Sequence, residues 1–320
     1  MIKNKIWFAA VFMTAFIPRA FAAPVEVSGE CVGVKLYTDG LIVCDTVALT
    51  ERDGTERDIA AEYGIEKGDV ITAVGGAAPE TNESLIDALA SCKGCITLTL
   101  RRGEKERTLD IAPADTEDGA RLGLWLRDST AGFGTVTCYV GDRFAALGHG
   151  ICDVDTGNIM PVSRGIIQES ENLFVTKSRM GLPGAISGEI EGEVIGTITD
   201  NRENGLFGTT SHHNGTVMET AVKTELRRGE AAILADVDGK GVKEYAAEIK
   251  RILPGTDGRD MIIRITDDSL IEKTGGIVQG MSGAPVIQNG KLAGAITHVF
   301  LSDARSGYAI AAENLLDGMI

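Results

Sequence analysis

The sequence predicts a mainly β protein built from two domains, and three observations lead to this expectation. The chain has 320 residues, enough for two domains of ordinary size, and 43% of them are hydrophobic, which supplies apolar side chains for two cores. It contains 40 glycines against 8 prolines, without a three-residue period, as expected for turn-rich β structure. From Gly123 onward, short apolar runs recur between glycine turns, and no long helical patterns separate them.

The formal charge argues against nucleic acid as a partner. The chain has 46 acidic and 31 basic residues, which gives a net charge of −15 at pH 7. No long run of lysine or arginine offsets this charge, so the surface repels phosphate backbones. We therefore expect no nucleic-acid partner.

The N-terminal segment has the pattern of a secretory signal peptide at residues 1–22. Two lysines precede an apolar run over residues 6–17, and an A-x-A pattern follows at residues 20–22. Cleavage is expected after Ala22, because cleavage one residue later would place Pro24 beside the scissile bond. An uncleaved anchor is the alternative, but the apolar run is shorter than the roughly 20 residues that span a bilayer. Removal of the segment takes away three basic residues and changes the formal charge from −15 to −18.

Export leaves the state of the six cysteines open, because an oxidising compartment permits disulfides and a reducing one keeps thiols. Cys92 and Cys95 have the C-x-x-C spacing of redox and zinc sites, but neither a second pair nor a nearby histidine completes four ligands. A local disulfide or plain structural cysteines are expected there, and no metal site is expected. Cys152 is expected to be a small buried side chain.

Residues 25–112 form one compositional unit. Two strands are expected at 32–36 and 41–45, joined by a hairpin turn at residues 38–40, because Asp-Gly favours such turns. The further elements expected in this unit are a short helix at 59–63 stopped by Gly64, an amphipathic helix at 82–92 and a strand at 96–101.

The segment over residues 61–76 carries a motif. It resembles the PDZ signature A-x-x-G-I-x-x-G-D-x-I-x-x-V-x-G, and the expected helix and strand follow in the order of that domain. The resemblance implies a PDZ domain over residues 25–112, which binds a peptide by strand addition while loop N–H groups capture a carboxylate. By resemblance to bacterial PDZ domains, that loop would consist of Gly33, Val34, Lys35 and Leu36. The alternatives are an intramolecular docking surface, or a turn glycine at position 33 that binds no ligand.

Residues 113–119 are polar and are expected to form a linker to a second domain over residues 120–320. The recurrent short strands of this domain predict an all-β barrel or a sandwich pair, and its length suits two small barrels packed together. One helix is expected near the C-terminus, at residues 311–316.

Residues 280–297 carry the strongest indication of chemistry. The pattern is G-x-S-G-x-P, an apolar pair, an Asn-Gly turn and a second apolar strand, which resembles the surroundings of the nucleophile in chymotrypsin-like proteases. A glycine at position 280 lets the backbone turn sharply, so that the N–H groups of Gly280 and Ser282 converge into an oxyanion hole beside the serine hydroxyl. The alternative is a glycine-rich hairpin with an idle serine.

A serine nucleophile needs a general base, and the chain has four histidines. His149 ends an apolar strand between two glycines that leave its ring uncovered, so we expect it to be the base. His212 and His213 lie in a polar stretch and are expected to be exposed to solvent. His298 lies on the strand after the nucleophile and is expected to be a core histidine, with a role in substrate specificity as the alternative.

A serine peptidase of this kind also uses an acidic residue to orient its histidine, and the spacing of residues along the sequence does not identify that acid. The candidates are Asp153, Asp155, Asp200, Asp267 and Asp268.

A closer resemblance covers nearly all of residues 25–320. The segments 123–135, 146–156 and 265–283 resemble the SpoIVB peptidase family, stage IV sporulation protein B, in which an export signal and a PDZ domain precede an unusual chymotrypsin-like serine peptidase. The resemblance implies the catalytic residues His149, Asp267 and Ser282. No observation outside the resemblance selects Asp267 over Asp268.

The same resemblance implies a regulatory endopeptidase of sporulation that needs no metal or organic cofactor. Such a protein is exported into the forespore intermembrane space, with transient tethering to the membrane as an alternative. It cleaves itself and a membrane-bound regulator of an intramembrane metalloprotease, which activates a late mother-cell sigma factor, while its PDZ domain binds a peptide ligand. The alternative function is a non-catalytic PDZ adaptor on a protease-like barrel; intact His149 and Ser282 weigh against it.

Overall fold

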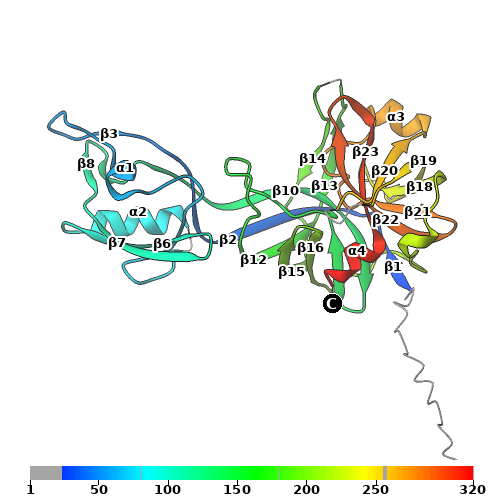
Figure 1. Cartoon of the computed structure of the whole chain (residues 1–320), viewed down its shortest axis with the longest axis horizontal. Helices are drawn as coiled ribbons and strands as arrows, with labels where there is room; N and C mark the ends of the chain where they lie inside the picture. The colour runs from blue at the N-terminus through cyan, green and yellow to red at the C-terminus, as the bar shows by residue number, and fades with distance from the viewer. Residues whose placement is uncertain (1–23, 80, 180, 255–257, 320) are drawn as a thin grey trace, which may run out of the picture.

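The computed structural model describes residues 24–79, 81–179, 181–254 and 258–319, and the predicted signal peptide lies outside them. Figure 1 shows a lobe at one end of the long axis, which two long strands join to a larger body at the other end. The larger body consists of two rings of strands, so the prediction of a mainly β protein is confirmed. None of the helices in the described residues is long and apolar enough to cross a membrane.

The C-terminal barrel is a closed ring of six strands. Alternate side chains of its strands point inward, as in β19, where Tyr245, Ala247 and Ile249 are buried among exposed or half-buried neighbours. In order around the barrel, the strands are β18 (Gly229–Ala235), β19 (Lys243–Ile252), β20 (Met261–Ile265), β23 (Asp303–Ala311), β22 (Lys291–Phe300) and β21 (Pro285–Gln288).

A second ring, here called the N-terminal ring, also closes on itself, because β2 pairs with both β10 and β12. In order, its strands are β2 (Cys31–Thr46), β10 (Leu124–Val140), β11 (Arg143–Ala146), β16 (Gly205–Thr209), β15 (Val194–Arg202) and β12 (Val162–Glu169). Buried residues of both rings meet in one cluster, where Ala145 and Phe207 of the N-terminal ring lie with Leu292 and Ile310 of the barrel. The two rings therefore share an apolar interface.

Shorter elements surround the rings. They are β1 (Val25–Val27), which lies between β10 and β17 (Thr216–Met218), the pair β13 (Glu171–Thr176) and β14 (Ala185–Glu189), the 3-10 helix η1 (Lys223–Glu225), and the helices α3 (Asp268–Thr274) and α4 (Ala312–Asp317). The helix predicted at 311–316 is thus confirmed, displaced by one residue.

The lobe at the other end, here called the distal lobe, comprises residues 41–126 and has its own apolar core. The outer halves of β2 and β10 enter it, and its helices pack on that core through residues such as Ile59, Leu85 and Leu89. Its own elements are β3 (Leu49–Thr50), β4 (Glu56–Arg57), α1 (Ile59–Tyr63), β5 (Val70–Val74), α2 (Asn82–Ser91), β6 (Ile96–Arg102), β7 (Lys105–Ile111), β8 (Ala114–Thr116) and β9 (Gly119–Arg121).

The two helices predicted in this lobe are confirmed, and local signals explain their ends. Helix α1 ends at Gly64, which has a φ of 63°, in the left-handed region that glycine adopts without cost. Helix α2 begins at Thr81, whose side chain accepts a hydrogen bond from the N–H of Ser84 while the Ser84 hydroxyl lies within bonding distance of the Thr81 N–H.

The predicted hairpin at residues 38–40 is wrong. Residues 31–46 form the single continuous strand β2, which pairs with β10 along both halves. Gly40 has a φ of 96°, and a Cβ there would lie 2.4 Å from the carbonyl oxygen of Ile71. The Asp-Gly pair therefore marks an irregularity where β2 passes from the ring into the distal lobe, rather than a reversal of the chain.

The pairing also divides the chain differently from the prediction. Residues 25–38, predicted to belong to the same unit as α2, pair with strands of the larger body. β1 pairs with β10 and with the short strand β17, and the first half of β2 pairs with β10 and β12. Residues 113–119, expected to be a linker, contribute β8 and the buried Ala114 to the distal lobe. The distal lobe is therefore inserted between two strands of the N-terminal ring.

Candidate active site

A cavity of about 410 Å³ lies between the two rings, and both His149 and Ser282 line it. The N-terminal ring contributes apolar residues such as Val34 and Phe133, and the barrel contributes Val299. A mainly apolar lining with few polar groups is typical of a site that binds a substrate and positions reacting atoms.

The loop that carries Ser282 is held in place by strand β10. The N–H of Thr135 donates to the Ser282 carbonyl oxygen at 2.9 Å, and the Thr135 hydroxyl donates to the Gly280 carbonyl oxygen at 2.8 Å. Gly280 and Gly283 have φ angles of 97° and 94°, which favour glycine. At position 283 a Cβ would lie 2.0 Å from the Thr135 carbonyl oxygen, so only glycine fits this close approach.

The N–H groups of Gly280 and Ser282 are the predicted oxyanion hole. Within the described parts of the chain, neither of these N–H groups donates to a protein acceptor, whereas the N–H of Met281 between them donates to the Val278 carbonyl oxygen. Two free N–H groups on either side of one residue are available to a negatively charged oxygen. The arrangement agrees with an oxyanion hole, and the stabilisation of a reaction intermediate by these two N–H groups stays a prediction.

His149 follows β11, and the backbone leading to it is unusual. Leu147 and Gly148 have φ angles of 67° and 69°, and a positive φ is rare for leucine. Nδ1 of His149 lies 2.8 Å from the carbonyl oxygen of Gly150. Because a carbonyl only accepts, Nδ1 carries the proton and Nε2 is left free to accept one. Burial lowers the pKa of His149, and the bond to the Gly150 carbonyl opposes this effect.

His298 lies against His149, with 4.6 Å between the centres of the two rings. It was expected to be a core residue, but its side chain is exposed and lines the cavity. Loss of hydration, with the nearby His149 and Arg259, lowers the pKa of His298 to about 4. The His298 ring is therefore neutral near pH 7.

The Ser282 hydroxyl does not point at the base in this structure. Its Oγ donates to the carbonyl oxygen of Thr297 at 2.8 Å, and within the described residues no hydrogen bond joins Ser282 to His149. The two side chains share one cavity, and Ser282 Oγ must leave the Thr297 carbonyl before it can donate to Nε2.

Asp267, the acid implied by the family resemblance, lies elsewhere. It is the N-cap of α3, and its carboxylate accepts hydrogen bonds from the N–H groups of Leu270 and Ala246 and from the Ser269 hydroxyl. Among the described residues it makes no contact with His149, and it does not line the cavity. The signal for this role was present in the sequence, because Asp267 and Gly275 bracket α3 as an N-cap and a left-handed C-cap.

The predicted carboxylate-binding loop is also contradicted. Gly33, Val34, Lys35 and Leu36 lie inside β2 and pair on one side with residues 130–133 of β10 and on the other with residues 165–168 of β12. A strand paired on both sides has its N–H groups engaged, so this segment cannot capture a peptide terminus. Periodicity showed a strand here but not which neighbours it would have.

The other predicted residues have ordinary roles. His212 Nε2 lies 3.1 Å from the Glu30 carboxylate, and His213 Nδ1 lies 3.0 Å from that of Glu26, with His213 exposed and His212 half-buried. The six cysteines are free thiols, and Cys152 is exposed rather than buried as expected. Of the remaining acid candidates, Asp200 pairs with Arg202 on the surface at 2.7 Å.

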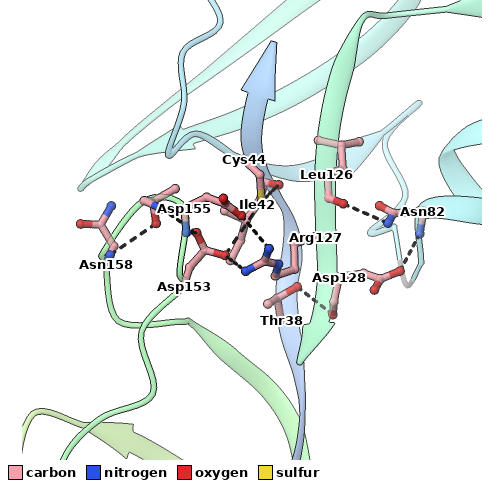
Figure 2. A network of polar contacts seen from close by, with 11 residues as sticks. Thr38, Ile42, Cys44, Asn82, Leu126, Arg127, Asp128, Asp153, Asp155 and Asn158 are labelled. Atoms are coloured by element: carbon pink, nitrogen blue, oxygen red, sulfur yellow. Dashed lines mark hydrogen bonds and ion pairs between the residues drawn. The ribbon is translucent and has the colours of Figure 1, made fainter. Parts of the chain in front are cut away.

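A polar network that the sequence analysis missed lies where the distal lobe meets the N-terminal ring (Figure 2). Arg127 of β10 binds Asp153 at 2.7 Å and Asp155 at 2.6 Å, and Cys44 lies beside them. Cys44, Asp153 and Asp155 are spaced like metal ligands, but the Arg127 guanidinium already forms an ion pair with each of the two carboxylates. Burial and the Asp153 charge raise the pKa of Cys44 to about 11, so the thiol stays protonated. These residues do not fit a metal site.

The fold and the cavity define a serine peptidase, with a glycine-held serine from one ring of strands beside a histidine from the other. The chain belongs to the SpoIVB peptidase S55 family, whose model matches residues 118–316. No curated protein matches the sequence.

The solved structures that are similar to the chain include two proteases. The active form of the Rv3671c protease from M. tuberculosis is 16% identical, with a TM-score of 0.35 over 60% of this chain and 73% of that one. The HtrA-type protease AlgW with decapeptide is 11% identical, with a TM-score of 0.37 over 92% of this chain and 64% of that one.

Proposed function

We propose that this protein is an exported, regulatory serine endopeptidase that works by chymotrypsin-like acyl transfer. The observation that carries the proposal is the shared cavity, in which Ser282 and His149 lie together beside the free N–H groups of Gly280 and Ser282. The two closed rings, with the histidine on the first and the serine on the second, support a chymotrypsin-like double barrel.

The chemistry follows from these positions. Once Ser282 Oγ turns to His149, it attacks the peptide carbonyl carbon while Nε2 takes its proton, and the developing oxyanion accepts from the two N–H groups. The carbon–nitrogen bond then breaks as His149 returns the proton to the leaving amine. Water, deprotonated by the same histidine, releases the acid product. The Gly150 carbonyl keeps the imidazole in the required tautomer, in the place usually held by a carboxylate.

The distal lobe fits the role of a PDZ domain with its groove in a different place from the predicted one. The outer half of β10, residues 124–128, pairs on one side with β2 and, within the described residues, has no strand on the other side. Helix α2 flanks this edge, and the Asn82 side-chain amide donates to one of its carbonyl oxygens, that of Leu126. A free strand edge beside a helix is the geometry for binding an extended peptide by strand addition.

We propose the substrates and the compartment that the family implies. The substrates are the chain itself and a membrane-bound regulator of an intramembrane metalloprotease, and cleavage would trigger activation of a late mother-cell sigma factor. The compartment is the forespore intermembrane space, reached through the signal segment at residues 1–22. Membership of the SpoIVB peptidase S55 family supports this role.

A non-catalytic adaptor is the second candidate. It is favoured by one observation, namely that the Ser282 hydroxyl donates to Thr297 instead of to His149. In the peptidase proposal the same contact is a resting state, because a single side-chain rotation removes it.

Time-resolved intact-mass analysis of purified residues 23–320 separates the two candidates. Wild type, Ser282→Ala and His149→Ala are compared alone and with the ectodomain of a candidate regulator added. The peptidase proposal expects trimming of the chain or the ectodomain by wild type alone. Identical mass patterns in wild type and both variants, with or without the ectodomain, would favour the adaptor.

A further inference from the structure

The orientation of His149 depends on the loop that follows it. Its Nδ1 donates to the carbonyl oxygen of Gly150, and Gly150 opens a loop over residues 150–161, here called the His149 loop. A movement of this loop at Gly150 would therefore change the orientation of the His149 ring.

The tip of the His149 loop is folded around one buried carboxylate. Asp153 is only 1% exposed, and its Oδ1 accepts from the N–H groups of Asp155 and Thr156 at 3.1 and 2.8 Å. Its other oxygen accepts from Arg127 Nη1 at 2.7 Å, and Arg127 Nη2 donates to Asp155 at 2.6 Å (Figure 2). Arg127 thus supplies the counter-charge without which the buried carboxylate would be unpaired.

The base of the His149 loop is held by a different residue. The Asn201 side chain accepts from the Ile151 N–H and donates to the carbonyl oxygens of Ile151 and Met160, all at 2.8 to 3.1 Å. Asn201 belongs to β15 of the N-terminal ring. The loop is therefore fixed at its base by the ring and at its tip by Arg127.

Arg127 lies on a strand that also contacts the distal lobe. Its neighbours in β10 point the other way, toward the start of α2 (Figure 2). The Leu126 carbonyl oxygen accepts from the Asn82 side-chain amide at 3.2 Å, and the Asp128 carboxylate accepts from the Asn82 N–H at 2.9 Å. Three consecutive residues of β10 thus join α2 on one side to the His149 loop on the other.

We propose that Arg127 is a positioning residue for the peptidase reaction, through which the distal lobe acts on His149. The inference rests on the proposed function. When α2 and the edge of β10 shift together, Arg127 carries the tip of the His149 loop with it. Although Asn201 holds Ile151 at the base of the loop, the pull at its tip shifts the Gly150 carbonyl relative to the imidazole. The Ser282 loop contacts β10 in the ring half of that strand, at Thr135 and Thr137, and stays in place. A displaced base slows proton transfer without changing the affinity of the cavity.

The test uses the full mature chain and an alkyl fluorophosphonate, which reacts with an activated serine. The Ser282 oxygen–phosphorus bond forms, fluoride leaves, and His149 takes the hydroxyl proton. The maximal labelling rate and the half-saturating concentration are measured for wild type, Arg127→Gln, Asn82→Ala and the double variant. We expect Arg127→Gln to lower the maximal rate by about 10- to 100-fold, as for a misplaced catalytic group, with the half-saturating concentration changed less than about twofold. Asn82→Ala alone should label more slowly than wild type. The double variant should label about as fast as Arg127→Gln alone, because both residues act through the same contacts.

Two further variants keep the test decisive. Arg127→Lys retains the charge and should recover part of the rate, which covers the case in which Arg127→Gln fails to fold. Arg52→Gln breaks an exposed ion pair with Asp115 in the distal lobe and should label like wild type. Equal labelling rates in wild type and folded Arg127→Gln, or fully additive effects of Arg127 and Asn82, would overturn the inference. Absence of Ser282 labelling in wild type would instead count against the proposed function itself.

Discussion

The two rings of strands carry the two halves of the site, and they differ in what holds them. The C-terminal barrel closes through six strands, none of which enters the distal lobe, and it carries Ser282 with its oxyanion loop. The N-terminal ring carries His149, and two of its six strands, β2 and β10, continue into the distal lobe. The proposed nucleophile therefore belongs to a barrel that contacts β10 in the ring half of that strand, at Thr135 and Thr137. The position of the proposed base depends on the part of β10 that enters the distal lobe.

This difference indicates where control of the reaction is exerted. The Ser282 loop is fixed by glycines and by Thr135, which lies in the ring half of β10, where that strand pairs with β2 and β11. In our proposal a movement of the distal lobe therefore has little effect on it. The His149 loop is fixed partly by Arg127, which in our proposal moves with the distal lobe. In the regulatory peptidase that we propose, activity therefore changes by movement of the base rather than of the nucleophile.

The largest expected effect comes from removing either half of the catalytic pair. Ser282→Ala and His149→Ala should each lower peptide-bond cleavage by about 10⁴-fold or more, and the double variant should be no slower than the worse single variant. The reason is that each residue acts only through the other. Single-turnover cleavage rates test this expectation, and losses that multiply in the double variant would show that the two residues work separately.

A smaller effect is expected where the rings meet. Thr135 and Thr137 are buried residues of β10 whose hydroxyls donate to the carbonyl oxygens of Gly280 and Gly283. Replacing either threonine with valine leaves a buried carbonyl without its donor, which should lower the free energy of unfolding by about 1–3 kcal/mol in both variants.

The two threonine variants should differ in activity. Only Thr135→Val loosens the carbonyl of Gly280, beside the oxyanion N–H groups, so we expect it to slow fluorophosphonate labelling by about tenfold and Thr137→Val to slow it much less. Denaturant unfolding and labelling rates are measured side by side. Equal activity losses in the two variants would show that the effect is one of stability alone.

The pH dependence tests the environment of the base. His149 must be neutral to accept a proton, and burial lowers its pKa, so activity should fall with acid only below the ordinary histidine value of 6.5. His298→Ala removes the ring that lies against His149, admits water and raises the pKa of His149. The acid limb of the labelling rate should therefore move to higher pH, while the plateau near pH 8 changes little.

The pKa of His149 also has a consequence for stability. The unfolded chain binds a proton below pH 6.5, whereas folded His149 resists protonation until a lower pH, so acid should destabilise the folded state in that range. Thermal unfolding between pH 5 and 8 measures this in wild type and His298→Ala. If the labelling rate of wild type fell to half its plateau at pH 6.5 or above, this would contradict the lowered pKa of His149.

The smallest expected effect is at Asp267. As the N-cap of α3, it should be replaceable by asparagine with almost no loss of stability, and by alanine at a cost of about 1 kcal/mol. The cleavage rate of Asp267→Asn should stay close to that of wild type, because its carboxylate lies outside the cavity. A loss of tenfold or more in a stably folded Asp267→Asn would show that Asp267 reaches His149 in an active state.

The sequence predicts the site better than the arrangement of the strands. Local chemistry identifies Ser282 and His149, because the glycines around them meet requirements that act within a few residues. Pairing partners are set over long distances, which is why Gly33 to Leu36 were assigned to a loop although β2 continues through them. The contact between Arg127 and Asp153 joins segments 26 residues apart, where the distal lobe meets the N-terminal ring. The pattern of apolar and polar residues in the sequence does not predict this contact.

The most direct test of the catalytic pair is to locate the adduct of an alkyl fluorophosphonate by peptide mass mapping. Wild type, Ser282→Ala and His149→Ala are treated in the same way after their folding has been checked by circular dichroism. The account predicts one adduct, on Ser282, in wild type, none in Ser282→Ala, and a strongly reduced amount in His149→Ala. Labelling of another residue in wild type, or equal labelling of Ser282 with and without His149, would contradict it.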